Sequence, residues 1–147
     1  MDFPEKMGIL IENPAFLGSL SGFENLRLLA SIKGHINENK IKETISRVGL
    51  NPDDKKKYRK YSLGMKQRLG IAAAVMESPE LIILDEPTNH LDIESTEWLE
   101  DFLRDYKGAF VIISHDRYFL DRVTNKTFEL ENNKLSVYLC IAHMYIT

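Results

Sequence analysis

Several features that would define a protein class are scarce or absent in this chain. Its 147 residues contain one cysteine, Cys140, which excludes an internal disulfide framework and is typical of a reducing cytoplasm. Cys140 lies in an apolar stretch, so we interpret it as a small hydrophobic residue. No apolar run approaches the roughly 20 residues of a membrane-spanning helix. The first residues, Met-Asp-Phe-Pro-Glu-Lys, lack the pattern of a signal peptide. Any role at a membrane would therefore require a partner.

Charge of one sign is not in excess either. The chain has 19 basic and 22 acidic residues, a net charge of −3, which does not indicate a nucleic-acid partner. One basic run covers residues 55–60, and we interpret it as a solvated face or linker. Nucleic-acid contact is the alternative for this run, although only Tyr58 and Tyr61 supply aromatic rings there. With 44% apolar and 28% charged residues, the composition is typical of one soluble globular domain.

The sequence also lacks the glycine-rich loop that binds nucleotide phosphates in many proteins. No Gly-x-x-x-x-Gly-Lys-Ser/Thr pattern occurs, and none of the eight glycines precedes a Lys-Ser or Lys-Thr pair. Such a loop supplies backbone N–H groups, a lysine and a magnesium-binding hydroxyl to the phosphates. Phosphate ligands of this kind are therefore not part of these 147 residues.

The most informative segment that is present runs from Leu81 to Asp92, Leu-Ile-Ile-Leu-Asp-Glu-Pro-Thr-Asn-His-Leu-Asp. Four apolar residues followed by two carboxylates predict a parallel strand that is covered on both faces. Such a strand ends where open α/β sheets bind their ligands. There Asp85 can hold Mg²⁺, usually through water, and Glu86 can polarise an attacking water. The alternative is a core strand followed by an acidic helix start.

Two shorter motifs flank this segment. Upstream, Ser62 and Gly64 open a predicted helix in Tyr-Ser-Leu-Gly-Met-Lys-Gln-Arg, and free N–H groups at a helix start favour a phosphate. Downstream, His115 follows an apolar run in Ile-Ile-Ser-His-Asp, at the end of another predicted buried strand. The alternatives are an ordinary capped helix for the first motif and a structural histidine for the second.

Hydrophobic periodicity and capping residues predict the remaining elements. Ser21 and Glu24 have the spacing of a capping box for a helix that ends near Gly34, and Asn37 caps a second helix that Gly49 ends. Further helices are predicted over 62–77, 93–106 and 116–122, and strands over 7–11, 81–85, 109–113, 127–131 and 134–139, with a turn at 132–133. In the fourth helix an apolar stripe is predicted to join the core: Trp98, Leu99, Phe102 and Leu103.

These elements predict an α/β fold with two parts. Residues 22–60 form a helical block without strands, and residues 80–131 alternate β-α-β-α-β. Asp85 and Ser114 are 29 residues apart, about the length of one right-handed crossover unit.

The order of motifs resembles that of the ATP-binding cassette (ABC) ATPases: signature motif, Walker B, D-loop and switch histidine. The resemblance extends to about residue 137 and implies the C-terminal part of such a domain, without its Walker A motif. It divides the chain into the end of the N-terminal core and the Q-loop region at 1–21, a helical subdomain with the signature motif at 22–79, and half of a RecA-like core at 80–147. A truncated gene, a fragment and one piece of a split domain are the open interpretations.

The resemblance also implies site residues for ATP and Mg²⁺. Asp85 would position Mg²⁺, Glu86 would act as the general base, and His115 would contact the γ-phosphate. Asp92 would close the D-loop, which communicates across a dimer. Glu12 stands where most members have the Q-loop glutamine. Because Glu12 is a glutamate, the resemblance does not define whether this residue contacts Mg²⁺ or takes part in coupling.

The signature motif implies a second nucleotide-binding chain or half-domain. In the family, the residues that match Ser62, Gly64 and Met65 bind the γ-phosphate of ATP held by the opposite subunit. This chain reads Ser-Leu-Gly-Met where the common motif is Ser-Gly-Gly-Gln. Variants of this kind occur in antibiotic-export ATPases.

The two halves resemble different branches of the family. Residues 7–87 resemble bacitracin- or lantibiotic-type exporter ATPases, which work with a membrane permease. Residues 85–137 resemble ABC-F proteins, which act on ribosomes, and residues 139–147 match neither branch. We therefore expect a cytoplasmic ATP-binding subunit of a peptide or antibiotic exporter, held at the membrane by its permease. An ABC-F fragment and a non-catalytic remnant or chimera are the alternatives, and ATP hydrolysis by this chain stays open without a Walker A motif.

Overall fold

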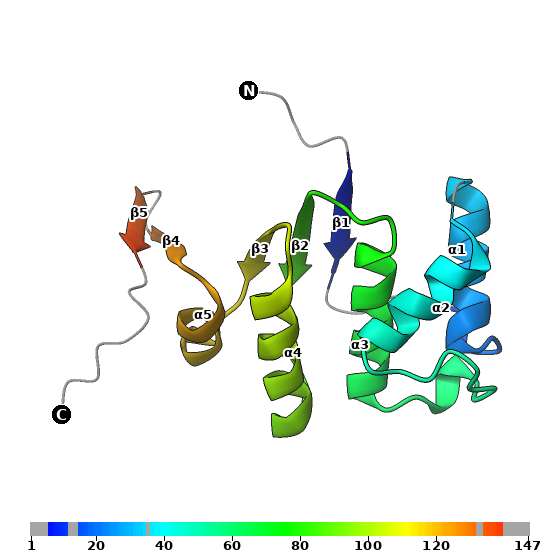
Figure 1. Ribbon diagram of the computed structural model, residues 1–147. Coiled ribbons are helices and arrows are strands. Elements are labelled where there is room, and N and C mark those ends of the chain that lie inside the picture. Colours follow the sequence, from blue (N-terminus) through cyan, green and yellow to red (C-terminus); the bar gives the residue numbers. More distant parts are fainter. Residues whose placement is uncertain (1–5, 12–14, 35, 132–133, 140–147) are drawn as a thin grey trace.

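The computed structural model describes residues 6–11, 15–34, 36–131 and 134–139. Glu12, the predicted turn at 132–133, Cys140 and most of the 139–147 tail lie outside these residues. The helices are α1 (Gly22–Lys33), α2 (Glu38–Arg47), α3 (Leu63–Val75), α4 (Ile93–Asp105) and α5 (Arg117–Val123), with a short 3₁₀ helix at Tyr58–Lys60. The strands are β1 (Met7–Leu10), β2 (Leu81–Asp85), β3 (Ala109–Ile113), β4 (Lys126–Glu131) and β5 (Lys134–Leu139). Each predicted helix and strand is confirmed to within a few residues (Figure 1).

The strands form two sheets. β1, β2 and β3 make a parallel sheet in that order, with Leu10 opposite Leu84 and Asp85 opposite Ile113. β4 and β5 form a separate antiparallel hairpin. The predicted β-α-β-α-β order is therefore confirmed, with β2 and β3 joined through α4 so that their carboxyl ends meet.

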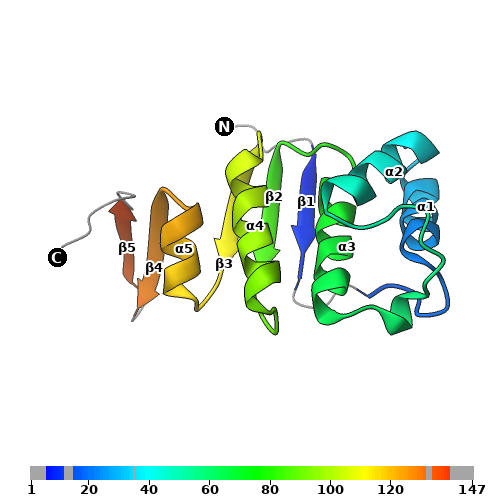
Figure 2. The ribbon, with the colours of Figure 1, turned by 60° about the horizontal axis from the view of Figure 1, so that its bottom comes forward.

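The three-stranded sheet is covered on one face only, so the prediction of strands buried on both faces is wrong. On the covered face, Leu10, Ile82 and Leu84 are at most 3% exposed. On the opposite face, Ile9 is 54% and Val111 is 49% exposed. Side chains alternate across a strand, and α4 and α5 lie over the same side of the strands (Figure 2). The second face is apolar in sequence but has no covering layer among the described residues.

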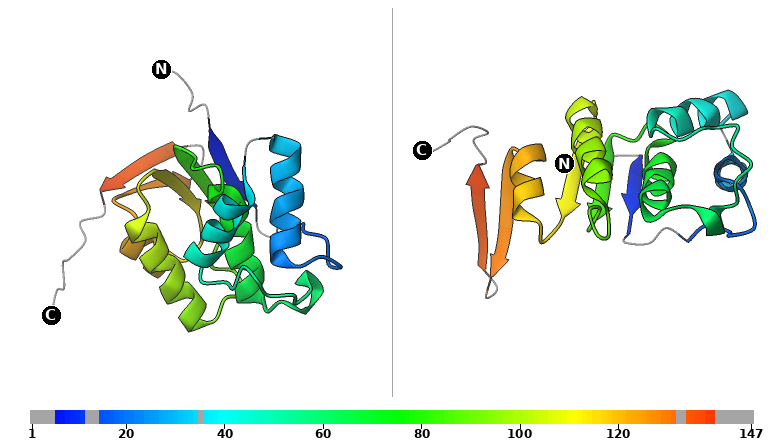
Figure 3. Two further views of the ribbon diagram at one scale, coloured as in Figure 1. Left: turned by 45° about the vertical axis from the view of Figure 1, so that its right-hand side comes forward. Right: turned by 90° about the horizontal axis from the view of Figure 1, so that it is seen from below.

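The closest helix-to-strand approach is that of α3 to β1. A Cβ atom added at Gly8 would collide with the backbone carbonyl of Ala74 on α3, so only glycine allows this packing. Helix α3 also packs with α1 and α2 (Figure 3). These three helices contribute buried apolar side chains to the same core as the sheet, among them Leu26, Ile41, Ile45 and Leu69, with Val48 directly after α2.

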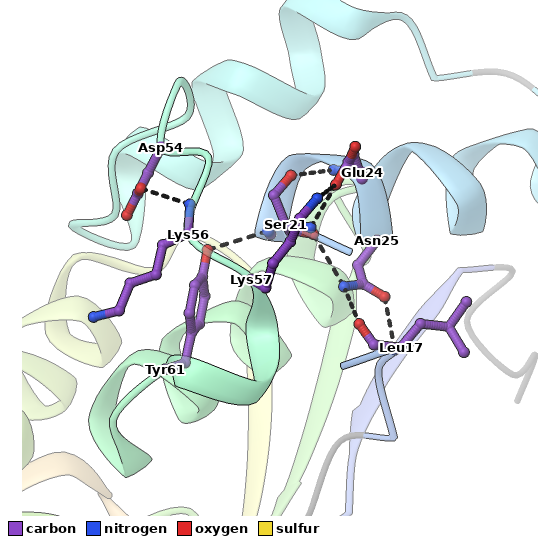
Figure 4. Close-up of polar contacts among 9 residues, drawn as sticks. Leu17, Ser21, Glu24, Asn25, Asp54, Lys56, Lys57 and Tyr61 are labelled. Atoms are coloured by element: carbon purple, nitrogen blue, oxygen red, sulfur yellow. Dashed lines mark hydrogen bonds and ion pairs between the residues drawn. The ribbon is translucent and has the colours of Figure 1, made fainter. Parts of the chain in front are cut away.

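Local capping explains where the helices of this block begin. Ser21 Oγ accepts a hydrogen bond from Glu24 N–H, and the Glu24 carboxylate accepts one from Ser21 N–H at 2.6 Å, which confirms the predicted capping box. Asn37 caps α2 by accepting from Lys40 N–H. In the same block, Asn25 bonds the carbonyl of Leu17 and fixes the chain before α1 (Figure 4).

The basic run at 55–60 is mostly a solvated surface, as predicted, but it is anchored at two points. Lys57 pairs with Glu24 at 3.1 Å, and Tyr58 is only 8% exposed. The following Tyr61 accepts a hydrogen bond from Gly22 N–H through its hydroxyl (Figure 4). These contacts join the segment before the signature motif to the start of α1.

Within the described ranges, none of the helices has the length and apolar character needed to cross a lipid bilayer. The predicted stripe on α4 does join the core: Leu99 and Leu103 are fully buried, while Trp98 and Phe102 pack against them partly exposed.

Candidate functional site

The carboxyl end of β2 carries the first part of the candidate site. Glu86 adopts a left-handed backbone conformation with φ +44°, which is uncommon for a residue other than glycine. Its N–H donates to the carbonyl of Ile113 at 2.8 Å, so the edge of β3 holds this conformation in place. Its side chain is only 12% exposed. Strained backbone of this kind persists where the surrounding structure enforces it, and it is concentrated at functional sites.

The carboxylate of Glu86 meets the residues that follow β3. His115 Nε2 lies 3.3 Å from Glu86 Oε1, and Ser114 Oγ donates to Glu86 Oε2 at 3.3 Å. The His115 side chain is otherwise fully exposed. The structure thus brings together Glu86 and His115, two of the residues that the family resemblance implies for the ATP site.

The helix after His115 is held firmly against α4. Asp116 caps α5 by accepting from Phe119 N–H, and Arg122 on α5 donates to the buried carboxylate of Glu100 at 2.6 Å. Glu100 is 3% exposed, so this charge is removed from water and satisfied by arginine. These contacts fix the position at which the chain leaves His115.

Asp85 is the one predicted metal ligand in this part of the chain. It ends β2, is partly exposed, and lies opposite Ile113. Among the described residues, no three His, Cys, Asp or Glu side chains converge as a metal-binding group. A single carboxylate can serve a magnesium ion whose other ligands are phosphate oxygens and water, and the role of Asp85 as a metal ligand remains a prediction.

The signature motif lies at the start of α3. Ser62 caps this helix by accepting from Met65 N–H at 3.2 Å, and Ser62 itself is exposed. A Cβ atom at Gly64 would collide with Ser95 Oγ at the start of α4, so glycine permits the two helix ends to touch. Lys56 Nζ lies 3.9 Å from the sulfur of Met65.

Asp92 caps α4 beside the signature motif. Its carboxylate accepts from Ser95 N–H at 2.8 Å. This backbone hydrogen bond, the Ser95 hydroxyl and the Arg68 guanidinium lower the pKa of Asp92, whereas burial opposes the change. Asp92 therefore has a structural role in this chain, and its predicted role across a dimer remains a prediction.

The predicted site residues thus fall into two groups. Asp85, Glu86 and His115 lie at the carboxyl edge of the sheet, whereas Ser62, Gly64, Met65 and Asp92 lie where α3 and α4 begin. No hydrogen bond or ion pair among the described residues joins the two groups directly. Glu12, which the resemblance places at the Q-loop position, is outside the described part of the chain.

A buried polar residue in contact with the Glu86 turn was missed by the sequence analysis. Gln67 is 6% exposed, and its Nε2 donates to the carbonyl of Pro87, directly after Glu86, at 2.9 Å. The sequence does contain a signal for it. Gln67, Ile71 and Ala74 have the spacing of one helix face, so the glutamine is a polar side chain on a face that is otherwise apolar.

Comparison with known proteins identifies the family of this chain. A family model described as ABC transporter matches residues 1–89. The bacitracin transport ATP-binding protein BcrA of Enterococcus faecalis is 47% identical over 98 residues, 67% of this chain and 32% of BcrA. The energy-dependent translational throttle protein EttA of Haemophilus influenzae is 43% identical over 101 residues, 69% of this chain and 18% of EttA.

The chain spans only part of the proteins it matches. For two Bacillus subtilis ABC transporter ATP-binding proteins, the aligned segments cover 15% and 63% of their length. Among solved structures, an inward-facing putative metal-chelate type ABC transporter matches with a TM-score of 0.80 at 20% identity, over 92% of this chain and 59% of that chain. Its similarity confirms the cassette-type α/β fold. Because the family model matches residues 1–89, more than half of the 147 residues, the chain belongs to the ABC transporter family of ATP-binding proteins.

Proposed function

We propose that this chain is the signature-motif and Walker B part of the ATP-binding subunit of an exporter for an antibiotic or peptide. The observation that carries the proposal is the contact of Glu86 with His115 at 3.3 Å, at the end of the Walker B strand. The similarity to BcrA, which extends over 98 residues, favours the exporter branch. In this role the chain acts on the cytoplasmic side of a membrane permease.

The geometry suits phosphate-bond hydrolysis with water as the nucleophile. Glu86 accepts a hydrogen bond from that water and orients it, and His115 faces the γ-phosphate from the exposed side of the same carboxylate. Asp85, one residue earlier and partly exposed, would hold the metal through its carboxylate. Mg²⁺, when bound, neutralises the phosphate charge that develops during the reaction.

The start of α3 serves a different nucleotide in this proposal. Ser62, Gly64 and Met65 have no described contact with Glu86 or His115. Helix α3 has 13 residues, and the free N–H groups at its start favour a phosphate. We infer that this end binds the γ-phosphate held by a second nucleotide-binding unit in a head-to-tail dimer.

The function requires polypeptide beyond these 147 residues, in the same protein or in another one, to supply the phosphate-binding loop. The open face of the sheet supports this inference, because Ile9, Val111 and Ile113 are each about half exposed. In addition, a cavity of about 820 Å³ separates β3 from β4, with Phe110 and Phe128 in its lining. Apolar surface of this kind marks an interface in a soluble protein.

A ribosome-associated ATPase is the second candidate. Its support is the 43% identity to EttA over 101 residues and the ABC-F-like sequence from Asp85 to about 137. A non-catalytic remnant or chimeric reading frame is the third candidate, since the segments before and after Asp85 resemble different branches.

The first experiment is calorimetric titration of the purified, folded chain with MgATP, alone and after co-purification with a cassette segment that carries a phosphate-binding loop. We expect binding and phosphate release only in the complex. A complex that forms but neither binds nor hydrolyses ATP would reject the ATPase proposal. Co-purification with a permease supports the exporter role, and co-sedimentation with ribosomes supports the second candidate.

A further inference from the structure

The helix that carries the signature motif is tied to the Glu86 turn by one buried side chain. Gln67, on α3, is 6% exposed and donates from Nε2 to Pro87 O at 2.9 Å. Among the described residues, this is the hydrogen bond that links α3 to segment 86–91. A buried amide is retained at a core position only where it is satisfied, because an unpaired one costs free energy.

The bond acts at the point where the chain leaves Glu86. Glu86 has φ +44°, and its carbonyl accepts from Asn89 N–H at 3.1 Å. Pro87 lies inside this turn, and its ring fixes its own φ near −65°. A hydrogen bond to the Pro87 carbonyl therefore restrains the remaining backbone rotation of Pro87, and with it the path of the turn that carries Glu86.

The same helix carries the signature residues. Ser62 precedes Gln67 by about one and a half helical turns, so both lie on one rigid segment. Gly64 touches Ser95, which provides a second contact between the start of α3 and the segment after Glu86. A displacement of the signature end is thus transmitted to the Pro87 carbonyl.

We propose that Gln67 is a positioning residue that couples the signature helix to Glu86. It holds the Glu86 carboxylate beside His115 while the start of α3 is in place, and it releases the turn when α3 moves. Its catalytic consequence rests on the proposed function, because it requires Glu86 to act on water. The restraint that Gln67 places on the Glu86 turn depends only on the Gln67–Pro87 hydrogen bond and on the left-handed backbone of Glu86.

The test compares Gln67→Met with Thr44→Val in the nucleotide-free chain. Methionine has a similar length to glutamine and lacks the N–H donor. The control also removes a buried hydrogen bond, from Thr44 Oγ1 to Lys40 O at 2.8 Å, but within α2. Two-dimensional amide NMR spectra are recorded for each variant. Urea denaturation measures the free energy of unfolding of each variant and shows whether the two substitutions destabilise the chain equally.

We expect Gln67→Met to shift the amide resonances of Glu86, Asn89 and His115, and Thr44→Val to leave them unchanged. Gln67→Asn, whose amide is drawn back from Pro87 by one methylene and loses the bond, is a second variant that should shift the same resonances. Unchanged Glu86 and His115 resonances in a folded Gln67 variant, or equal shifts in the control, would overturn the proposal.

A kinetic measurement in the complete cassette tests the catalytic consequence. Gln67→Met should lower kcat by about tenfold, because misplacing a reacting group by a fraction of an ångström is costly. KM for MgATP should stay within about twofold, since Gln67 does not touch a phosphate site. If the unsubstituted cassette is active, an unchanged kcat in Gln67→Met counts against the coupling. If the unsubstituted cassette is inactive but Gln67→Met still shifts the Glu86 and His115 resonances, only the ATPase proposal is contradicted.

Discussion

At the scale of single residues, Glu86 combines two features that its sequence context does not reveal. Its backbone is left-handed, and its mostly buried carboxylate accepts hydrogen bonds from the residues that follow β3. A strand followed by Asp-Glu predicts a carboxylate at the edge of the sheet. The contact of Glu86 with His115 and Ser114 also requires β3 to pair with β2 in one register, so that Ile113 lies opposite Asp85.

Replacement of Glu86 by glutamine tests its role as the base. In a cassette completed with a phosphate-binding loop, Glu86→Gln should lower ATP turnover at least about 100-fold, because general-base catalysis commonly contributes that much. MgATP binding should be retained, since glutamine preserves the size of the side chain. Turnover is measured by phosphate release and binding by calorimetry.

The control for this experiment is Glu80→Gln, at an exposed position just before β2. It removes the same charge without touching the Glu86–His115 contact and should leave turnover unchanged. Undiminished hydrolysis in Glu86→Gln would remove Glu86 as the base.

The capping box provides a prediction for stability against pH. The pKa of Glu24 is lowered to about 2, chiefly by the Ser21 N–H, then by Lys57 and the Ser21 hydroxyl, from an ordinary value of 4.5. A lowered pKa stabilises the folded state above pH 4.5, and this contribution is lost as pH falls from 4.5 toward 2. Glu24→Gln should therefore destabilise the chain at pH 7 and have progressively less effect in acid.

Urea denaturation at pH 7, 4 and 3 measures this difference in unfolding free energy. Glu43→Gln is the matched control, because Glu43 makes only an exposed 3.5 Å ion pair with Lys40, which contributes little. A Glu24→Gln effect that stays constant or grows in acid would contradict the proposed stabilisation.

At the scale of elements, the contact between the starts of α3 and α4 determines the position of the signature motif. Gly64→Ala places a Cβ atom against Ser95 Oγ and should destabilise the chain by about 1–3 kcal/mol, the usual cost of overpacking. The double variant with Ser95→Ala should lose less than the sum of the two single changes, because Ser95→Ala removes the clashing hydroxyl. Thermal or urea denaturation of all four proteins checks this, and strict additivity would contradict a direct contact.

Element prediction succeeded where short-range chemistry determines the outcome. Ser21, Asn37 and Ser62 each cap the helix that the sequence predicts for them, because the side chain bonds a backbone N–H only three residues away. The burial of β2 and β3 was mispredicted, since a continuous apolar run does not specify whether one or both faces of a sheet are covered.

At the scale of the whole molecule, the open face of the sheet should make the isolated chain self-associate. Val111→Thr should lower concentration-dependent association in sedimentation experiments, because Val111 lies on that face, at the middle of the edge strand β3, and is 49% exposed. Ile32→Thr, at a 76% exposed apolar position on α1 away from the sheet, is the control. Equal effects of the two changes would assign the association to general surface hydrophobicity.

The isolated chain should also bind ATP weakly. Without a phosphate-binding loop, most phosphate ligands are absent, so we expect a Kd no lower than about millimolar, or roughly 4 kcal/mol of binding free energy. Calorimetry with MgATP measures this directly. Micromolar affinity in the folded chain would show that its phosphate ligands are supplied in another way, for instance by self-association.

The sequence by itself determined the order of helices and strands, the helix caps and the family, because periodicity, capping and motif spacing act over a few residues each. The family resemblance also implied that Glu86 and His115 belong to one nucleotide site, but the sequence did not predict that their side chains touch. Only the tertiary structure decided which face of the sheet is covered, how Glu86 is strained, and that Gln67 bonds to Pro87. These features depend on how residues far apart in the chain pack in space, and local sequence patterns carry no information on that packing.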